Sequence, residues 1–169
     1  MTITQVLKFD TKSDVKLIDA LGPRFGAVLT AIVLAAILAS ASLPLLIWQL
    51  SVFAIGAFVG PQATPYAWIY RSLVKPRLRG DVPTEDTRPP QFAQVVGFLF
   101  ALTATVALVL EASLVFEVAI GFALAAAFLN AAFNFCLGCE TYLLIARARG
   151  AVSQRNNRED SYNLPSLEN

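Results

Sequence analysis

The feature that most restricts the fold of this chain is an uncharged stretch of 36 residues, from Phe25 to Gly60. It contains no ionisable side chain, and its only amide is Gln49. A helix needs about 20 apolar residues to cross a bilayer, so this stretch is long enough for two crossings. The segment "SASLP", Ser40 to Pro44, supplies a break between them, because a proline disfavours helix at the preceding residue. We therefore predict a membrane protein in which this stretch forms a helical hairpin.

Composition extends the same pattern to the rest of the chain. Of its 169 residues, 56% are hydrophobic and 15% are charged, whereas soluble domains carry about 25% charged residues. Two more apolar runs follow, each long enough to cross a bilayer. We predict an all-α, polytopic fold of two helical hairpins within a transmembrane domain at 25–145. Its four transmembrane helices are expected at residues 25–40, 45–59, 92–110 and 116–144.

Lysine and arginine are confined to three segments of the chain. Four lie in residues 1–24, five in the connection at 61–91 and four in the tail at 146–169. The other two connections between the predicted spans contain none. By the positive-inside rule, both termini and the middle loop lie in the cytoplasm. The tail is polar and is predicted to be disordered.

The middle loop carries a helix signal of its own. Thr64 suits an N-cap and Pro65 suits the first helical position. Aromatic and cationic side chains follow, which are typical of the headgroup region of a membrane. We predict a short helix that lies on the inner leaflet, and the alternative is an aromatic loop without helix. The predicted interface residues are Tyr66, Trp68, Tyr70, Arg71 and Lys75.

A weak internal repeat relates the two predicted hairpins. "GPRFGAVLTAIVLA" and "PPQFAQVVGFLFAL" share a Pro-x-Phe-x-x-Val frame 67 residues apart. Later, "GAFVGPQATPYAWIYR" and "AAFNFCLGCETYLLIAR" share Ala-Phe, then Tyr, then Arg. A duplication would place a pseudo-twofold axis along the membrane normal. It would also set the segment with both cysteines in the place that residues 60–63 occupy in the first half.

Cys136 and Cys139 form a CxxC near the end of the fourth predicted span. One thiol of such a pair can attack and the other can resolve, and Glu140 beside them is a candidate proton acceptor. A redox CxxC normally opens a helix, but here we expect the C-terminal end of a long one. The helix dipole, Glu140 and burial would then all oppose a thiolate, unless the helix breaks at Gly138. The alternatives are small packing residues or, in a symmetric dimer, a metal site.

The fourth predicted span also carries a polar stripe. In a regular helix Asn130, Asn134 and Thr141 fall within about 40° of one another. Such side chains usually join helices in a membrane by hydrogen bonds, so we predict a helix-packing role. A polar cavity or a substrate path is the alternative.

Several function classes are disfavoured by what the sequence omits. The chain has no histidine, which is the commonest metal ligand and general base. Its two cysteines cannot complete a four-cysteine metal site within one chain. It carries no phosphate-binding or hydrolase motif, and its net charge of +1 gives no nucleic-acid footprint. We predict neither a bound cofactor nor a nucleic-acid partner.

Three segments resemble a known family: "LGPRFGAVLTAIVLA", "RPPQFAQVVGFLFAL" and "LNAAFNFCLGCETYLL". They are similar to the bacterial membrane family named domain of unknown function 4395, over roughly Leu21 to Ile145. Its most specific part is the CLGCE block at Cys136 to Glu140. The resemblance implies a four-span protein of the bacterial inner membrane. Some members occur beside or fused to thioredoxin-like or sulfurtransferase modules, which implies a partner of that kind.

These observations lead to two function hypotheses. In the first, the protein exchanges electrons or sulfur through Cys136 and Cys139, with Glu140 as a nearby proton acceptor. In the second, it is a non-catalytic accessory subunit of a larger membrane complex, such as a respiratory-chain assembly. A transporter is less favoured, because no predicted span carries a charge near its centre.

Overall fold

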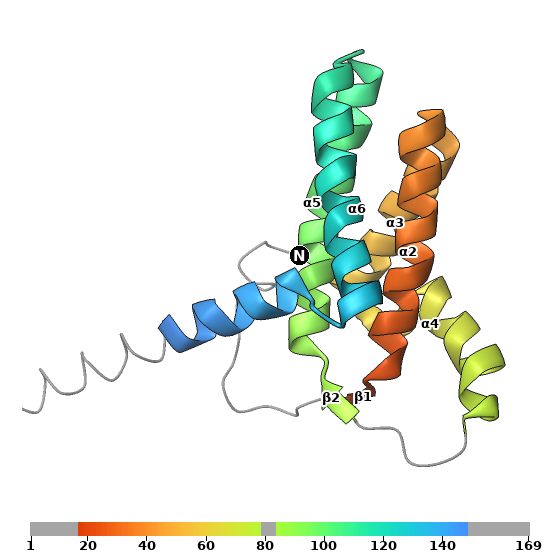
Figure 1. Ribbon diagram of the computed structural model, residues 1–169, viewed down its shortest axis with the longest axis vertical. Coiled ribbons are helices and arrows are strands. Elements are labelled where there is room, and N and C mark those ends of the chain that lie inside the picture. The colour runs from red at the N-terminus through yellow and green to blue at the C-terminus, as the bar shows by residue number, and fades with distance from the viewer. Residues whose placement is uncertain (1–16, 79–83, 149–169) are drawn as a thin grey trace, which may run out of the picture.

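The computed structural model describes residues 17–78 and 84–148 (Figure 1). The N-terminal segment before Leu17, part of the middle-loop linker and residues 149–169 of the tail predicted to be disordered lie outside these residues, whereas residues 146–148 of that tail are helical. In chain order the elements are β1 (Leu17–Asp19), α2 (Leu21–Ser40), α3 (Leu43–Phe58), η1 (Pro61–Ala63), α4 (Pro65–Ile69), η2 (Tyr70–Val74), η3 (Lys75–Arg77), β2 (Thr84–Asp86), α5 (Arg88–Val109) and α6 (Ser113–Phe133). Residues 137–148 form one more helix.

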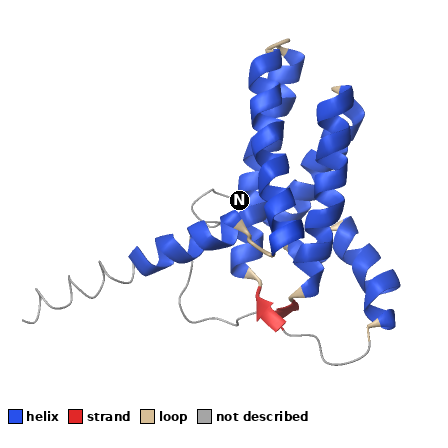
Figure 2. Ribbon diagram, viewed as in Figure 1, coloured by secondary structure: helices blue, strands red, loops and turns tan. Residues whose placement is uncertain are grey.

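Helices α2, α3, α5 and α6 pack as a bundle (Figure 2). Helix α2 packs mainly against α6, α3 against α5, and α5 also against α6, while α2 and α3 touch less. Within the described residues α2, α5 and α6 are long and apolar enough to cross a membrane, and α3 is apolar but shorter, with 16 residues. These helices confirm the all-α class and indicate a membrane protein. The break predicted between Ser40 and Pro44 is also present, since α2 ends and α3 begins there.

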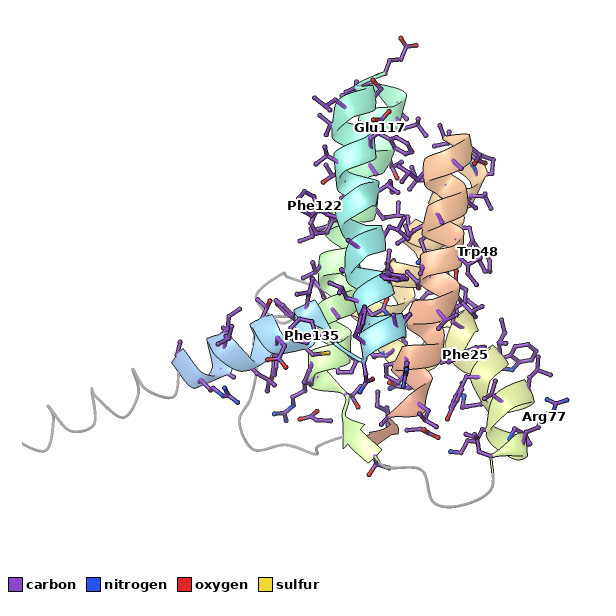
Figure 3. All side chains as sticks on the ribbon, viewed as in Figure 1. Phe25, Trp48, Arg77, Glu117, Phe122 and Phe135 are labelled. Carbon is purple, nitrogen blue, oxygen red and sulfur yellow. The ribbon has the colours of Figure 1, made fainter. Side chains whose placement is uncertain are left out.

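The sides of the bundle explain the apolar composition. Small residues lie where α5 and α6 meet their neighbours, and they let the backbones approach closely. Large apolar side chains point outward, as Trp48 and Phe122 do in Figure 3. Phe122 is 63% exposed, an unusual position for a side chain that strongly prefers an apolar surrounding. The buried small residues are Ala101, Ala104, Ala107, Ala119 and Ala123.

The predicted helix in the middle loop is present. The side chain of Thr64 accepts a hydrogen bond from the backbone N–H of Ala67, and Pro65 occupies the first turn. This N-cap arrangement satisfies a backbone donor that would otherwise lack a partner. The helix continues from α4 through a π-helical turn and a 3₁₀ turn to Arg77. The alternative of an aromatic loop without helix is therefore wrong.

A two-stranded ribbon joins the starts of the two hairpins, and the sequence analysis missed it. Strands β1 and β2 pair antiparallel, with Ile18 opposite Glu85 at the centre. Each strand ends in an aspartate that caps the following helix: Asp19 accepts from the N–H of Leu21, and Asp86 accepts from the N–H of Arg88. The same 67-residue offset that relates the repeated sequences also separates β1 from β2 and the start of α2 from the start of α5. The ribbon closes the end of the bundle that carries α4.

The predicted fourth span, 116–144, is wrong at its C-terminal end. Helix α6 ends at Phe133, and Asn134 follows in the left-handed conformation with a φ of 56°. Residues 134–136 are not helical, and the chain then starts a separate helix at 137–148. Figure 1 shows this last helix running away from the foot of the bundle rather than continuing along α6.

Candidate functional site

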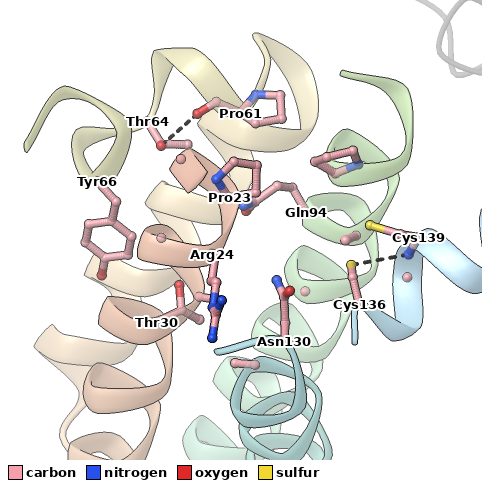
Figure 4. Close-up of a pocket in the computed structure, with 18 of the residues that line it drawn as sticks. Pro23, Arg24, Thr30, Pro61, Thr64, Tyr66, Gln94, Asn130, Cys136 and Cys139 are labelled. Carbon is pink, nitrogen blue, oxygen red and sulfur yellow. Dashed lines mark hydrogen bonds between the residues drawn. The ribbon is translucent and has the colours of Figure 1, made fainter. Parts of the chain in front are cut away.

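A cavity of about 690 Å³ lies among the bundle helices, at the end that carries the ribbon and α4 (Figure 4). Its wall is formed by the first turns of α2 and α5, the last turns of α6, α4 and the start of the helix at 137–148. Both cysteines lie in this wall. Ligand sites in proteins commonly enclose about 300–1,000 Å³, so the cavity is large enough for a small organic molecule.

The cysteine pair opens the helix at 137–148 instead of closing a longer one. Cys136 is the residue before the first helical position, and its Sγ accepts a hydrogen bond from the backbone N–H of Cys139 at 3.3 Å. The carbonyl of Cys136 accepts from the N–H of Glu140 at 3.0 Å, the first bond of the new helix. The expectation of a helix C-terminus at this site is therefore wrong, and the sign of the dipole reverses. A helix N-terminus stabilises a thiolate.

The break before the pair has a local cause. Asn is the residue besides glycine that most readily adopts the left-handed conformation, and Asn134 adopts it as the residue after α6. The N–H of Asn134 bonds to the carbonyl of Asn130, and the N–H of Phe135 bonds to that of Leu129. These bonds satisfy carbonyls at the end of α6 and turn the chain. The break lies before Cys136, earlier than the position considered at Gly138.

Two contacts dock the new helix on α5. A Cβ built on Gly138 would lie 2.6 Å from the Cβ of Ala93 and 2.7 Å from its Cα, so only glycine fits between these two backbones. One turn further on, the rings of Phe92 and Tyr142 lie 6.0 Å apart at 50°. The glycine between the two cysteines thus places the pair directly against the first turns of α5.

Polar side chains from three helices face the cavity near the cysteines. Arg24 of α2 donates from Nε to the carbonyl of Ala131 in α6, and Asn130 lies in the same view (Figure 4). Gln94 of α5 also lines the cavity, and its Oε1 is buried and accepts no hydrogen bond from any described residue. Sequence reasoning missed Arg24 and Gln94 as site residues. The signal was available for Arg24, which stands between Pro and Phe in the repeated frame.

The break between α6 and the helix at 137–148 separates the three residues of the predicted polar stripe, so they do not lie on one helix face. Asn130 stays in the last turn of α6 and lines the cavity, whereas Asn134 is the left-handed residue after it. Thr141 belongs to the next helix, is exposed and donates to the carbonyl of Leu137. All three residues nevertheless line the cavity, which agrees with the alternative of a polar cavity. Glu140 is exposed at the rim beside the cysteines.

The five predicted interface residues are divided by the structure. Trp68 is 66% exposed, but Tyr66 and Tyr70 are buried within the protein. Arg71 donates to the carbonyl of Gln62, and Lys75 forms an ion pair with Asp19 at 3.6 Å.

Both buried tyrosines donate hydrogen bonds. The hydroxyl of Tyr66 donates to Oε1 of the fully buried Gln49 at 2.9 Å, and burial raises the pKa of Tyr66. The hydroxyl of Tyr70 donates to Oδ1 of Asp19 at 2.9 Å. Burial, followed by this hydrogen bond and the negative charge of Asp19, raises the pKa of Tyr70 to about 12. The hydrogen bond from Tyr70 holds the middle-loop helix to Asp19 at the end of β1.

Among the described residues, no three side chains of His, Cys, Asp or Glu gather as they would around a metal ion. A comparison with curated proteins and with solved structures finds no match. The family comparison does find one: the profile described as "Domain of unknown function (DUF4395)" matches residues 18–147, which cover the ribbon, the bundle and the CxxC helix. By this match the chain belongs to the DUF4395 family.

Proposed function

We propose that this protein exchanges electrons or sulfur with a partner through Cys136 and Cys139. The observation that carries the proposal is the position of the pair at the start of a helix, on the wall of a cavity. A CxxC at a helix N-terminus is the arrangement in which the first thiol is activated as a nucleophile. The sequence alone suggested the opposite end of a helix, which would have favoured a packing role.

The hydrogen bond assigns different roles to the two thiols. The backbone N–H of Cys139 points at the sulfur of Cys136, so a negative charge on Cys136 is the better stabilised. Cys136 is therefore the attacking thiolate and Cys139 the resolving thiol. In exchange with a disulfide, a bond forms from Cys136 to one partner sulfur, and the other partner sulfur leaves and takes a proton. Cys139 then displaces the first partner sulfur, closing the Cys136–Cys139 disulfide. Glu140 is close enough in sequence to accept the proton of Cys139.

The membrane arrangement proposed here has four spans with both termini in the cytoplasm. Helix α3 has 16 residues, or about 24 Å, but it lies alongside α5 and its outer face is apolar. Bilayers thin locally around a short apolar helix, which supports a fourth crossing. The cations of the described residues belong to the start of α2, the middle loop, the start of α5 and the last helix, all at the end with the ribbon. The positive-inside rule assigns this end, and with it the cysteine pair, to the cytoplasmic side of a bacterial inner membrane.

The two hairpins are proposed to be duplicates, and several contacts support this. In the ribbon, Leu17 pairs with Asp86 and Asp19 with Thr84, which is the reciprocal pattern of a twofold axis for a 67-residue offset. The residue between Pro and Phe donates to the carbonyl of a partner helix in both halves: Arg24 to Ala131, and Gln91 to Ala57. The following phenylalanine contacts a tyrosine in both halves, in the pairs Phe25–Tyr70 and Phe92–Tyr142. The cysteines have no counterpart in the first half, so the exchange site is specific to the second.

Trapping with oxidised glutathione tests the exchange proposal. The reduced, detergent-purified protein is mixed with glutathione disulfide and analysed by mass spectrometry. We expect Cys139→Ser to accumulate a mixed disulfide at Cys136, and wild type to pass on to an internal disulfide. Cys136→Ser is the matched control and should react several-fold more slowly. Equal trapping by both single variants, or reaction no faster than in the denatured protein, would contradict the proposal.

The partner proposed for this exchange is a thioredoxin-like or sulfurtransferase protein of the cytoplasm. The position of the pair supports it, because the helix at 137–148 projects away from the foot of the bundle, where a soluble protein has access (Figure 1). The pair is also half-buried rather than sealed inside the bundle.

A further inference from the structure

The cavity beside the cysteines is polar at one end and apolar at the other. Arg24, Gln94 and Asn130 lie in the turns nearest the cysteine pair. Phe100 is six residues further along α5, or about 9 Å deeper, and the buried Ala123 is seven residues back along α6, or about 10 Å deeper. The deeper wall is completed by apolar and small residues, including Phe53, Gly97 and Ala126. A ligand that fits this shape has a polar head and an apolar body.

The charges of the wall disfavour a small inorganic anion. Arg71 donates to the carbonyl of Gln62, and Lys75 is paired with Asp19. Arg24 also lines the cavity, and its Nε donates to the carbonyl of Ala131, so each of these three cations already has a partner. Glu140 adds a negative charge to the same wall. Compact anions such as phosphate or thiosulfate are usually held by several cations or by many aligned N–H groups. A neutral head with hydrogen-bonding oxygens matches one guanidinium and two amides better.

The amide groups suggest that the head changes its hydrogen-bonding character. The side chains of Gln94 and Gln62 line the cavity, but the Oε1 atom of each is buried, lies against the backbone of Gly56 or Gly60, and accepts no hydrogen bond from any described residue. A buried polar atom without a partner costs about 1–3 kcal/mol, so each amide gains by turning its oxygen toward a cavity ligand that donates a hydrogen bond. Arg24 and the amide NH₂ groups, in contrast, favour a ligand that accepts. A quinone accepts hydrogen bonds at its carbonyl oxygens, and the corresponding quinol donates them from its hydroxyl groups.

We propose that the cavity binds a lipid-soluble quinone, which takes two electrons from the Cys136–Cys139 pair. This inference rests on the exchange function proposed above and names its electron acceptor. In the reaction the two S–H bonds break and one S–S bond forms between Cys136 and Cys139. The two electrons and two protons pass to the quinone, whose two carbonyl oxygens become hydroxyl groups. The disulfide is reopened by the exchange above run in reverse: a cytoplasmic dithiol reduces it and becomes a disulfide, so the electrons of that dithiol enter the membrane quinone pool.

Binding is tested without the redox step. The Cys136→Ser/Cys139→Ser protein in lipid nanodiscs is titrated with decylubiquinone, and bound quinone is measured by equilibrium dialysis. We expect saturation at one quinone per chain. Ala126→Phe, which fills the cavity, should weaken binding at least tenfold. Ala125→Phe is the matched control, because Ala125 is the exposed neighbour on the same helix and does not line the cavity. Asn130→Leu provides a second cavity variant should Ala126→Phe fail to fold.

The redox step is tested with the reduced wild-type protein under anaerobic conditions. We expect one quinol to form and two thiols to be lost per chain, and Ala126→Phe to slow both changes while Ala125→Phe does not. Absence of saturable binding, equal binding by Ala126→Phe and Ala125→Phe, or binding without thiol loss would each overturn the quinone inference. Glutathione trapping at Cys136 is independent of these results. If the trapping succeeds and the quinone experiments fail, the exchange function stands and its acceptor is a different molecule.

Discussion

Gly138 provides the sharpest test of how the cysteine pair is positioned. In Gly138→Ala the new Cβ would lie 2.6 Å from the Cβ of Ala93, whereas carbon atoms in ordinary contact lie about 3.5–4.0 Å apart. The nearest atoms include the Cα of Ala93, which cannot rotate away, so the helix at 137–148 has to retreat from α5 by about 1 Å. Forcing an extra methyl group into a packed contact costs about 1–3 kcal/mol. Alanine offsets part of this, because it favours helix over glycine by about 0.5–1 kcal/mol.

The net weakening of about 1–2 kcal/mol corresponds to a 5- to 30-fold smaller ratio of docked to undocked helix. Cross-linking measures it directly. In a protein whose native cysteines are serines, Phe92→Cys and Tyr142→Cys place two new thiols at a pair of rings that lie 6.0 Å apart. A short bifunctional maleimide should join them more slowly when Gly138→Ala is added, and the rate falls by the full factor where the loss of the two rings leaves the helix mostly undocked. Gly121→Ala in α6 is the control, because its Cβ would meet nothing within 4 Å. An unchanged cross-linking rate in Gly138→Ala would refute the reasoning.

Two further predictions concern the break and the middle loop. Asn134→Ala places alanine at a φ of 56°, which costs about 1–2 kcal/mol and favours continuation of α6. The reaction of Cys136 with glutathione disulfide should therefore slow in Asn134→Ala, whereas Asn134→Gly should react at the wild-type rate. The pKa of Tyr70 is raised from its ordinary value near 10 to about 12 in the folded protein, so the unfolded chain loses this proton first as pH rises. The free energy of unfolding that Tyr70 contributes is therefore fully present below pH 10 and is lost as pH rises to 12. Thermal unfolding between pH 9 and about 12 should show this decline, and Tyr70→Phe should reduce it; an identical profile for Tyr70→Phe would exclude this origin.

The apolar runs predicted the helices of the bundle because a helix that crosses a membrane must be both long enough and apolar enough. The uncharged stretch from Phe25 to Gly60 contains both α2 and α3 almost entirely, and the proline after "SASL" marked the turn between them. Thr64 and Pro65 predicted the start of α4, since an N-cap depends on neighbouring residues alone. Each of these features depends on residues that are close in sequence, so tertiary packing does not change the structure that they predict.

The end of α6 was not predicted because hydropathy does not report backbone conformation. The residues after Asn134 are as apolar as those before it, so the run appeared to continue to Leu144. Asn134 was instead assigned to a polar stripe, although its capacity for the left-handed conformation was the informative property. The ribbon was missed for a different reason: three residues per strand are too few for an alternating pattern.

The inward position of Tyr66 and Tyr70 also depends on tertiary structure. Aromatic residues beside cations are typical of a membrane surface, and Trp68 follows that pattern. The two tyrosines find polar partners, Gln49 and Asp19, in parts of the chain 17 and 51 residues away. These groups meet only because the middle-loop helix folds back so that Tyr66 reaches α3 and Tyr70 reaches the end of β1.

Asp19 connects three elements through one carboxylate. It ends β1, caps α2 through the N–H of Leu21, accepts from Tyr70 and pairs with Lys75. A displacement of the middle-loop helix therefore pulls on the first turn of α2, and β1 passes the same force to β2 and the start of α5. The start of α2, the middle-loop helix and the start of α5 are thus joined through Asp19 and the ribbon, and the cysteine helix contacts this joined wall at Gly138 and Ala93.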